Sequence, residues 1–340
     1  MYDRRTAMAA LAAWASLPLG ASAQTTTILF NSFIPPTHPV NVRVFKPWAE
    51  EIEKATQGRV KIEMPPSSLA APPQQMDGAV KGVFDMAYQF HGLVENKVKL
   101  PQVAHLLGVN STAKGSSIAL WRTYERFFKS ADEYKNLHLL GLFVFQSGTI
   151  FGMKKPIDAL ADVKGIKMFG LPGVAATVLE AAGAGVVAVP AVRSYEIISG
   201  GTVDAFAGYS VLDASAFKTL QYARYITDLP GGLTAPSFAL FMNKKKWDSL
   251  SAADREVLTR MTGEALAARM GVLDEIDNKL RADAAAQGIQ IRSASTAFSA
   301  EMRRLASPIE QAWLKDAQAL GVDGPAALAF YKEQATLAAK

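Results

Sequence analysis

The chain has 340 residues, of which 49% are apolar and 20% are charged, and its formal net charge is +5 at pH 7. This balance is typical of a globular protein with room for two domains, and it excludes a largely disordered chain. The chain has no cysteine, which excludes disulfides, thiol catalysis and cysteine-bound metals. Its lysines and arginines are spread along the sequence, so we expect no nucleic-acid partner.

The first 23 residues have the pattern of a secretory signal peptide. Two arginines at positions 4 and 5 precede an apolar run over residues 7–19, and residues 21–23 read Ala-Ser-Ala, a small-x-small cleavage sequence. The apolar run is shorter than the roughly 20 residues that a membrane-spanning helix needs. We therefore expect cleavage after Ala23 and a periplasmic protein, with export by either the Sec or the twin-arginine route.

Strands and helices alternate through the following part of the chain. The pattern predicts strands at 25–33, 60–64, 166–169 and 186–189, and helices at 42–55, 74–81 and 174–182. The strand at 166–169 runs into a turn that ends at Gly173. This alternation predicts an α/β fold with largely parallel sheets.

Two segments of the chain share one local plan. AVKGVFDMAY at 79–88 and IISGGTVDAFAGY at 197–209 each contain a helix end, a glycine and a short strand that begins near an aspartate. We expect a left-handed glycine to end each helix, and both strands to point their carboxyl ends at a shared cleft. Two lobes of similar construction would explain this similarity.

A long helical pattern covers residues 251–287. Ser251 is the expected N-cap, Asp254 completes a capping box, and Gly288 ends the run. One helix of this length would be about 55 Å long, enough to bridge two lobes. A strand at 289–291 and helices at 297–320 and 325–338 complete the chain.

Catalytic and cofactor patterns are missing from the sequence. The four histidines lack the spacing of a helical zinc site, and we expect only His91 to lie near a cleft. Gly183-Ala184-Gly185 follows a helix and precedes a strand, the reverse of a dinucleotide-binding loop. We therefore predict no cofactor, no metal and no enzymatic activity. The alternative is a secreted hydrolase or lyase that uses cleft carboxylates.

The chain resembles the solute-binding subunits of TRAP transporters, the tripartite ATP-independent periplasmic importers. The resemblance rests on an ordered series of segments: HPVNVRVFKPWAEEIEKATQGRVKIEM, GVFDMAY, KKPIDALADVKGIKM, GGTVDAF, SFALFMNKKKWDSLSAADREVL and the helical run after it. It implies a two-lobe periplasmic-binding-protein fold with an interlobe cleft and a long helix that spans both lobes. It also implies hinge closure on a small solute and delivery to membrane-embedded permease subunits. A sensory role is the alternative to transport, and we expect a monomer.

The resemblance also implies a division of the chain. We assign residues 24–147 and 234–272 to lobe I, residues 148–233 and 288–340 to lobe II, and residues 251–287 to the bridging helix.

The expected ligand follows from departures from the family pattern. The family typically binds carboxylates through an arginine in a Lys-Ile-Arg sequence, and Phe169 takes that place here. A second arginine, which often lies about twenty residues upstream in the family, is missing from the stretch around Gln146. A buried carboxylate without a paired cation is costly, so we expect an amine or an aromatic or neutral solute. Arg193 is the alternative cation if the ligand is a carboxylate. The predicted ligand-binding residues are Phe33, Tyr88, Phe90, His91, Gln146, Ser147, Phe169, Tyr209 and Asp213.

Overall fold

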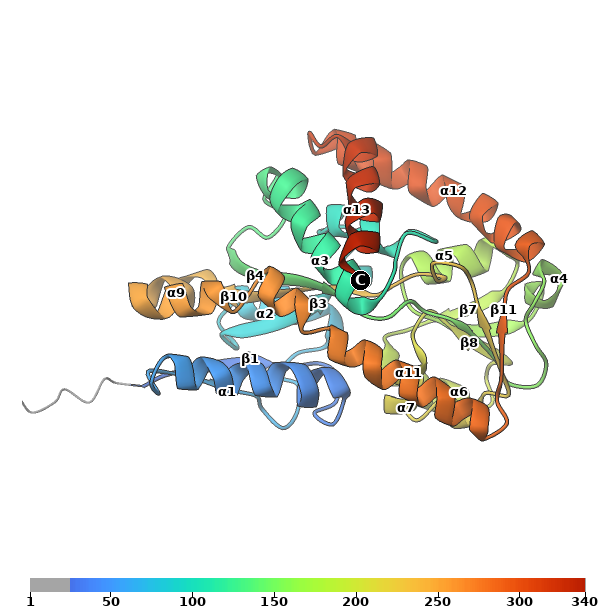
Figure 1. Cartoon of the computed structure of the whole chain (residues 1–340), viewed down its shortest axis with the longest axis horizontal. Helices are drawn as coiled ribbons and strands as arrows, with labels where there is room; N and C mark the ends of the chain where they lie inside the picture. The colour runs from blue at the N-terminus through green and yellow to red at the C-terminus, as the bar shows by residue number, and fades with distance from the viewer. Residues whose placement is uncertain (1–24, 340) are drawn as a thin grey trace, which may run out of the picture.

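The computed structural model describes residues 25–339 and contains two mixed β-sheets, one in each half of the molecule (Figure 1). The first sheet has the strand order β2 (Val60–Glu63), β1 (Thr26–Asn31), β3 (Met86–Phe90), β10 (Ser237–Asn243) and β4 (Leu137–Val144). The second has the order β11 (Gln290–Ser293), β9 (Tyr225–Asp228), β5 (Ile150–Gly152), β8 (Ala205–Ala207), β6 (Lys167–Gly170) and β7 (Gly185–Ala188). We call the half with the first sheet lobe I and the other lobe II.

Each sheet contains one reversed strand, so both sheets are mixed, although the other strands of each sheet all run in one direction as expected. In lobe I, β10 runs antiparallel to both β3 and β4. In lobe II, β5 runs antiparallel to both β8 and β9. In both cases the reversed strand is the one that the chain enters directly from the other lobe. The α/β fold of two lobes is confirmed.

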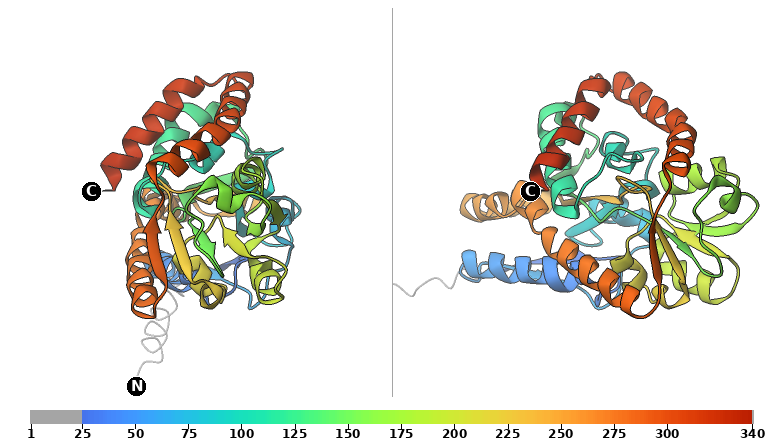
Figure 2. Two further views of the ribbon diagram at one scale, coloured as in Figure 1. Left: turned by 90° about the vertical axis from the view of Figure 1, so that its right-hand side faces the viewer. Right: turned by 45° about the vertical axis from the view of Figure 1, so that its right-hand side comes forward.

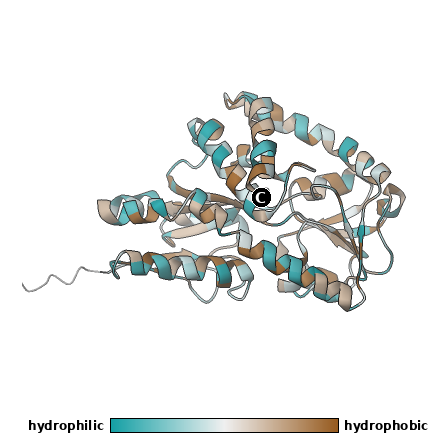
Figure 3. Ribbon diagram, in the orientation of Figure 1, coloured by the Kyte–Doolittle hydropathy of each residue, from teal (hydrophilic) through white to brown (hydrophobic). Residues whose placement is uncertain are grey.

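Helices surround the two sheets. The shorter helices are the π-helix η1 (Val40–Phe45), α1 (Lys46–Ala55), α2 (Gln75–Val80), α3 (Ala113–Thr123), the π-helix η5 (Tyr124–Phe128), α4 (Leu160–Val163), α5 (Val174–Ala181), α6 (Ser194–Ser199), α7 (Val211–Ala216) and α8 (Lys244–Ser249). Single 3₁₀ segments are η2 (Pro72–Gln74), η3 (His91–Leu93), η4 (Leu100–His105), η6 (Lys129–Ala131), η7 (Ala191–Arg193) and η8 (Leu220–Tyr222). Figure 3 shows hydrophilic and hydrophobic residues alternating along the longer helices, as expected of helices with one buried face.

The helix predicted at 42–55 is divided into η1 and α1. The N–H of Lys46 donates to the carbonyl of Asn41, five residues earlier. Pro47 follows in the first turn of α1. A proline has no N–H and its ring crowds the carbonyl four residues before it, so a regular α-helical turn is disfavoured at this point.

The two similar segments adopt the expected backbone. Gly82 has φ +73° after α2, and Gly201 has φ +68° after α6. The strand that follows begins directly after an aspartate in each lobe, at Met86 in β3 and at Ala205 in β8. The prediction of two left-handed glycines is therefore confirmed.

The single helix expected at 251–287 is instead a bent series of three, α9 (Ala252–Arg260), α10 (Glu264–Ala268) and α11 (Gly271–Ala286). Its start is as expected, because Ser251 Oγ accepts a hydrogen bond from the N–H of Asp254 at 3.1 Å. The first break is at Gly263, which has φ +57° and donates its N–H to the carbonyl of Leu140 in β4 at 2.7 Å. A hydrogen bond to the sheet thus replaces the helical one.

Helix α12 (Thr296–Ala319) also spans both lobes. Phe298 and Met302 at its start are buried in the core of lobe II, while Trp313 and Ala317 near its end are buried in the core of lobe I. Helix α13 (Gly324–Ala338) then packs along α3 of lobe I, and both helices cover the same side of the molecule in each view (Figures 1 and 2). Residues 288–340, which we assigned to lobe II, therefore have apolar faces that pack against the cores of both lobes in turn.

Two connecting segments join the lobes and lie side by side. They are residues 145–149, between β4 and β5, and residues 229–236, between β9 and β10. The N–H of Gly148 donates to the carbonyl of Thr234 at 2.6 Å, and the N–H of Phe145 donates to the carbonyl of Pro236 at 2.9 Å. We call these two segments together with α11 the hinge.

Helix α11 links the lobes through two carboxylates on successive turns. Asp274 accepts the N–H groups of Ala113 (2.7 Å) and Lys114 (3.0 Å) at the start of α3 in lobe I. Asp277 accepts the N–H of Leu212 at the start of α7 in lobe II, at 2.7 Å. The helix has 16 residues and is about 24 Å long. Unpaired N–H groups at helix starts are favourable partners for carboxylates, so α11 holds the two lobes through their helix ends.

No helix within residues 25–339 is both long and apolar enough to cross a membrane. The predicted signal peptide and its cleavage after Ala23 lie outside the described residues.

Candidate functional site

A small apolar cavity lies between the two lobes. Its walls come from loops that follow the strand ends on both sides, and its volume is about 30 Å³. Lobe I and its connectors contribute Phe33, Ile34, Phe90, Leu93, Phe145, Pro236 and Phe238, and lobe II contributes Leu171, Pro190, Ala191, Val192, Tyr209, Asp213 and Phe217. This volume is about that of one water molecule, so the lobes must separate to admit a ring-sized solute.

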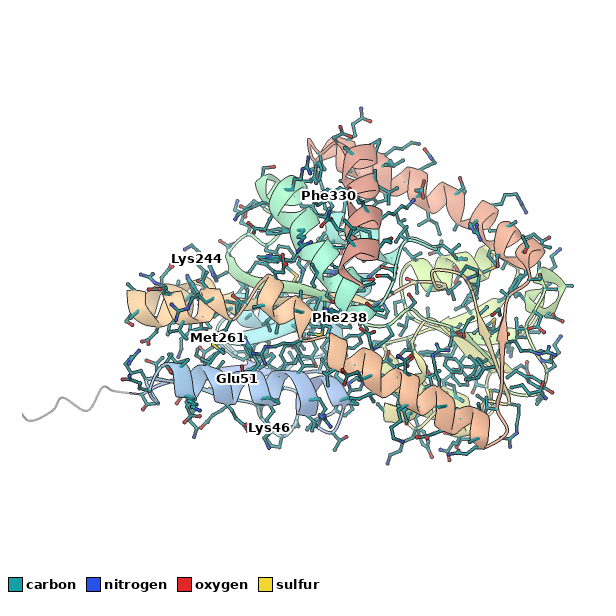
Figure 4. All side chains as sticks on the ribbon, in the orientation of Figure 1. Lys46, Glu51, Phe238, Lys244, Met261 and Phe330 are labelled. Carbon is teal, nitrogen blue, oxygen red and sulfur yellow. The ribbon has the colours of Figure 1, made fainter. Side chains whose placement is uncertain are left out.

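Six of the fourteen residues on the cavity wall are aromatic. Phe238 lies near the middle of the molecule (Figure 4), with its ring centre 4.5 Å from that of Phe145 and 5.4 Å from that of Phe90. On the lobe II side the rings of Tyr209 and Phe217 are 6.2 Å apart. These are the separations at which aromatic rings attract one another, so the wall is suited to a flat aromatic solute.

The acidic side chain on this wall is Asp213, which is 2% exposed. Its Oδ1 lies 3.1 Å from Nε2 of His38, a lobe I residue that is 1% exposed. Its Oδ2 accepts the N–H and the hydroxyl of Ser210, at 3.3 and 3.0 Å, and so caps α7. Among residues 25–339, no lysine or arginine lines the cavity.

A wider groove of about 470 Å³ adjoins the cavity. The two share Phe33, Ile34 and Val192, which therefore form the wall between them. The groove continues over Asn41 in η1 and Met64 after β2. Asn41 is fixed there because its amide donates to the carbonyls of Ile34 and Pro35, at 3.1 and 3.0 Å. We take this groove as the approach to the cavity.

The structure brings four of the predicted ligand-binding residues together on the cavity wall, namely Phe33, Phe90, Tyr209 and Asp213. The other five lie elsewhere, and whether any of the nine binds ligand stays a prediction.

Two of those five are aromatic residues directly behind the wall. Phe169 is fully buried in β6, and its ring centre is 5.6 Å from that of Tyr209. Tyr88 is fully buried among the rings of lobe I, including Phe238 at 6.0 Å, and its hydroxyl lies 2.5 Å from that of Ser32. Burial raises the pKa of both tyrosines, Tyr88 and Tyr209. These groups therefore support the wall without lining it.

His91 belongs to a separate polar chain inside lobe I. Its Nδ1 lies 2.8 Å from Ser237 Oγ and its Nε2 lies 2.8 Å from the hydroxyl of Tyr134. Ser237 Oγ also contacts His105 Nε2 at 2.9 Å. Burial lowers the pKa of His91 well below its usual value and lowers the pKa of His105 to about 3. This serine and its histidines are buried, so they form a structural network.

Gln146 and Ser147 lie in the hinge and not on the cavity wall. Both are in the connector after β4, and the side chain of Ser147 occupies the space beside Gly232 in the other connector. Arg193, the alternative cation, is exposed and pairs with Glu196 at 2.9 Å. In this structure its guanidinium is held away from the cavity.

Sequence reasoning missed His38 and the rings of Phe145, Phe217 and Phe238. Of the four histidines, we expected only His91 to lie near a cleft. The phenylalanines come from a connector, a helix end and a central strand, and only the packing of the lobes shows that they share one space. No group of three or more potential metal ligands is found among residues 25–339.

Comparison with protein families and known proteins gives a consistent result. A family model described as bacterial extracellular solute-binding protein, family 7, matches residues 30–316. A protein of Comamonas testosteroni named outer membrane transporter protein TsaT is 52% identical over 334 residues, with 98% of each chain covered. A solute-binding protein of Albidiferax ferrireducens is 26% identical over 235 residues, which are 65% of this chain and 66% of that protein.

Solved structures with the same fold contain aromatic acids. A TRAP periplasmic solute-binding protein of Bordetella bronchiseptica with bound (R)- and (S)-mandelate is 34% identical, with a TM-score of 0.87 over 92% of this chain and 99% of that one. A TRAP solute-binding protein of Rhodoferax ferrireducens with benzoate is 26% identical, with a TM-score of 0.83 over 92% and 98% of the two chains. A marine metagenome protein with 3-hydroxybenzoate is 28% identical, with a TM-score of 0.84 over 93% and 100%.

Proposed function

The chain belongs to the bacterial extracellular solute-binding proteins of family 7, the solute-binding subunits of TRAP transporters, and we propose that its ligand is an aromatic acid. Proteins of this kind bind a small solute in the periplasm and work with membrane permease subunits. The family is therefore one of transport, and we expect binding without turnover. The Sec or twin-arginine route, the cleavage after Ala23 and a monomeric state remain expectations.

The observation that carries the proposal is the ring-lined cavity between the lobes. Rings from both lobes, such as Phe238 and Tyr209, face the same small space, so closure would enclose a flat solute between them. Ring pairs contribute about 0.5–1.5 kcal/mol each beyond the burial of area. Three structural relatives hold mandelate, benzoate or 3-hydroxybenzoate, which supports the aromatic part of our sequence-based expectation and favours an acid over an amine.

We propose that the ligand contacts the wall residues directly. From the sequence prediction these are Phe33, Phe90, Tyr209 and Asp213, and the structure adds Phe145, Phe217 and Phe238. Tyr88, His91, Gln146, Ser147 and Phe169 act indirectly in this proposal, because each lies behind the wall, inside lobe I or in the hinge.

A calorimetric binding series tests the proposal on the mature protein. Benzoate, mandelate and 3-hydroxybenzoate should bind, whereas succinate, which lacks a ring, should bind much more weakly. Benzylamine, which carries a ring and an amine, is the matched compound for the alternative of an amine ligand. Tight binding of benzylamine with no binding of the three acids would overturn the aromatic-acid assignment, and consumption of a bound acid would contradict a transport role.

Phe169→Leu tests the support behind the wall. The smaller side chain should lower the free energy of unfolding by about 1–2 kcal/mol and weaken benzoate binding, because Tyr209 loses its packing partner. Phe128→Leu is the control, since Phe128 is almost equally buried but lies in lobe I near Trp313 and does not line the cavity. Equal benzoate affinity in both variants would show that Phe169 has no role in the site.

A further inference from the structure

The ring-lined cavity poses a charge problem for an aromatic acid. Among the described residues that line it, Asp213 is the one carboxylate, and none is a lysine, arginine or histidine. A second carboxylate in the same apolar space would be repelled by Asp213 and would need a hydrogen-bond donor. The nearest side-chain donor to Asp213 from the opposite lobe is His38, at 3.1 Å.

The tautomer of His38 follows from the hydrogen bond at its other ring nitrogen. The N–H of Val40 donates to Nδ1 of His38 at 3.2 Å, so Nδ1 acts as the acceptor. The ring proton of the neutral histidine must then be on Nε2, the atom that faces Asp213. His38 Nε2 is therefore a donor directed at a residue of the cavity wall.

The position of the His38 ring is fixed by two rings that line the cavity. It is stacked on Phe145 with ring centres 5.9 Å apart and an interplanar angle of 10°, and it lies 5.5 Å from Phe217. Phe145 belongs to the connector from lobe I and Phe217 to lobe II. His38 itself is not among the residues that line the cavity, so its Nε2–H lies behind the wall, against the carboxylate of Asp213.

Asp213 can release this donor without losing its other contacts. Its Oδ2 is held by the N–H and hydroxyl of Ser210, while the side-chain bond at Oδ1 is the one from His38. An acid group that took the Nε2–H would leave the capping of α7 intact.

We propose that His38 is the specificity-determining residue for the acid group, and that its Nε2–H passes from Asp213 to the carboxylate of the ligand. This inference rests on the proposed function, because it assumes that the ligand is an aromatic acid. Asp213 positions the histidine in the absence of ligand and opposes the entering anion. Its carboxylate therefore lowers the affinity for acids.

The sharpest test is whether Asp213→Asn raises or lowers the affinity for benzoate. The asparagine oxygen can still accept from His38, but the negative charge is gone. Benzoate affinity should rise at least about threefold, because like charges in an apolar site repel strongly. Benzamide affinity should stay within about twofold, and benzylamine affinity should fall. Asp204→Asn, at an exposed lobe II aspartate paired with Lys154, changes the net charge equally and should leave benzoate binding unchanged.

His38→Phe removes the donor and keeps a ring against Phe145. Benzoate affinity should fall at least about tenfold, with a smaller loss for benzamide, because hydrogen bonds to charged acceptors are about twice as strong as neutral ones. Thermal unfolding establishes that the variant folds, and the double variant with Asp213→Asn avoids leaving that carboxylate unpaired.

The outcomes separate the two proposals. If the wild type binds none of the aromatic acids, the proposed function fails. If it binds benzoate, but Asp213→Asn weakens that binding or the folded His38→Phe protein keeps it, the role of His38 is overturned and the proposed function stands.

Discussion

The cavity wall and helix α11 of the hinge meet at α7 but are built from opposite kinds of side chain. The cavity wall is apolar, with six aromatic residues among fourteen and Asp213 as its one charged residue. On α11 the hinge uses a half-buried carboxylate, Asp274, and a buried one, Asp277, which accept backbone N–H groups from a helix of each lobe. Ring contacts depend on the shape and charge of the solute, whereas backbone bonds hold the lobes together whatever the solute is. The cavity should therefore decide which ligand binds, and the hinge should change the affinity for all ligands alike.

Asp277→Ala should have the largest effect in the hinge. It removes the acceptor of the Leu212 N–H and one of two carboxylate partners of Arg281, the other being Asp228. We expect a loss of about 3–4 kcal/mol in the free energy of unfolding, measured in urea. Benzoate and benzamide should weaken by the same factor, in contrast to the Asp213 variant.

Asp283→Ala on the same helix is the matched control. Asp283 pairs with Lys279 on the exposed face, and such pairs contribute about 0.3–0.5 kcal/mol. If the ratio of benzoate affinity to benzamide affinity changed in the Asp277 variant, the distinction between cavity and hinge would be wrong.

Gly232→Ala should have the next largest effect. Gly232 has φ +80°, and a Cβ there would lie 2.2 Å from Cβ of Ser147 in the other connector. The two connectors must then move apart, so we expect a loss of about 2–3 kcal/mol in unfolding free energy and weaker binding of every ligand. Gly58→Ala has nearly the same backbone, φ +78°, with nothing within 4 Å. Gly58→Ala should lower the free energy of unfolding by only about 1–2 kcal/mol, and ligand affinity should not change.

The smallest predicted effect is on the pH dependence of the free energy of unfolding. Burial raises the pKa of Asp274, although the N–H groups of Lys114 and Ala113 work in the opposite direction. The folded protein then holds this proton more tightly than the unfolded chain does. Its contribution favours folding below the usual aspartate pKa and is lost as pH rises through the raised one. Urea unfolding at a series of pH values measures this effect. In Asp274→Asn, the free energy of unfolding should decrease less as the pH rises. An unchanged slope would contradict a buried, titrating Asp274.

Much of the fold was predictable because it depends on local chemistry. Ser251 caps a helix through its own hydroxyl, and Gly82 and Gly201 end helices in the left-handed conformation that glycine adopts freely. The family resemblance, carried by segments along nearly the whole mature chain, correctly implied two lobes and a TRAP solute-binding protein. These features need only neighbouring residues or an ordered set of segments.

Other features were decided only by contacts between distant residues. Gly263 ends a helix because its N–H reaches Leu140, and α13 joins lobe I because its apolar face meets α3. His38 meets Asp213, 175 positions later, at 3.1 Å, and only the fold brings these two residues together.

Sequence by itself therefore determined the elements, their caps and the family, since each is set by residues within a few positions or by their order. Tertiary structure alone decided where the elements break, which lobe the carboxyl-terminal helices cover and which side chains share the cavity. The physical reason is that burial and hydrogen bonding across the lobes outweigh local preference wherever the two compete.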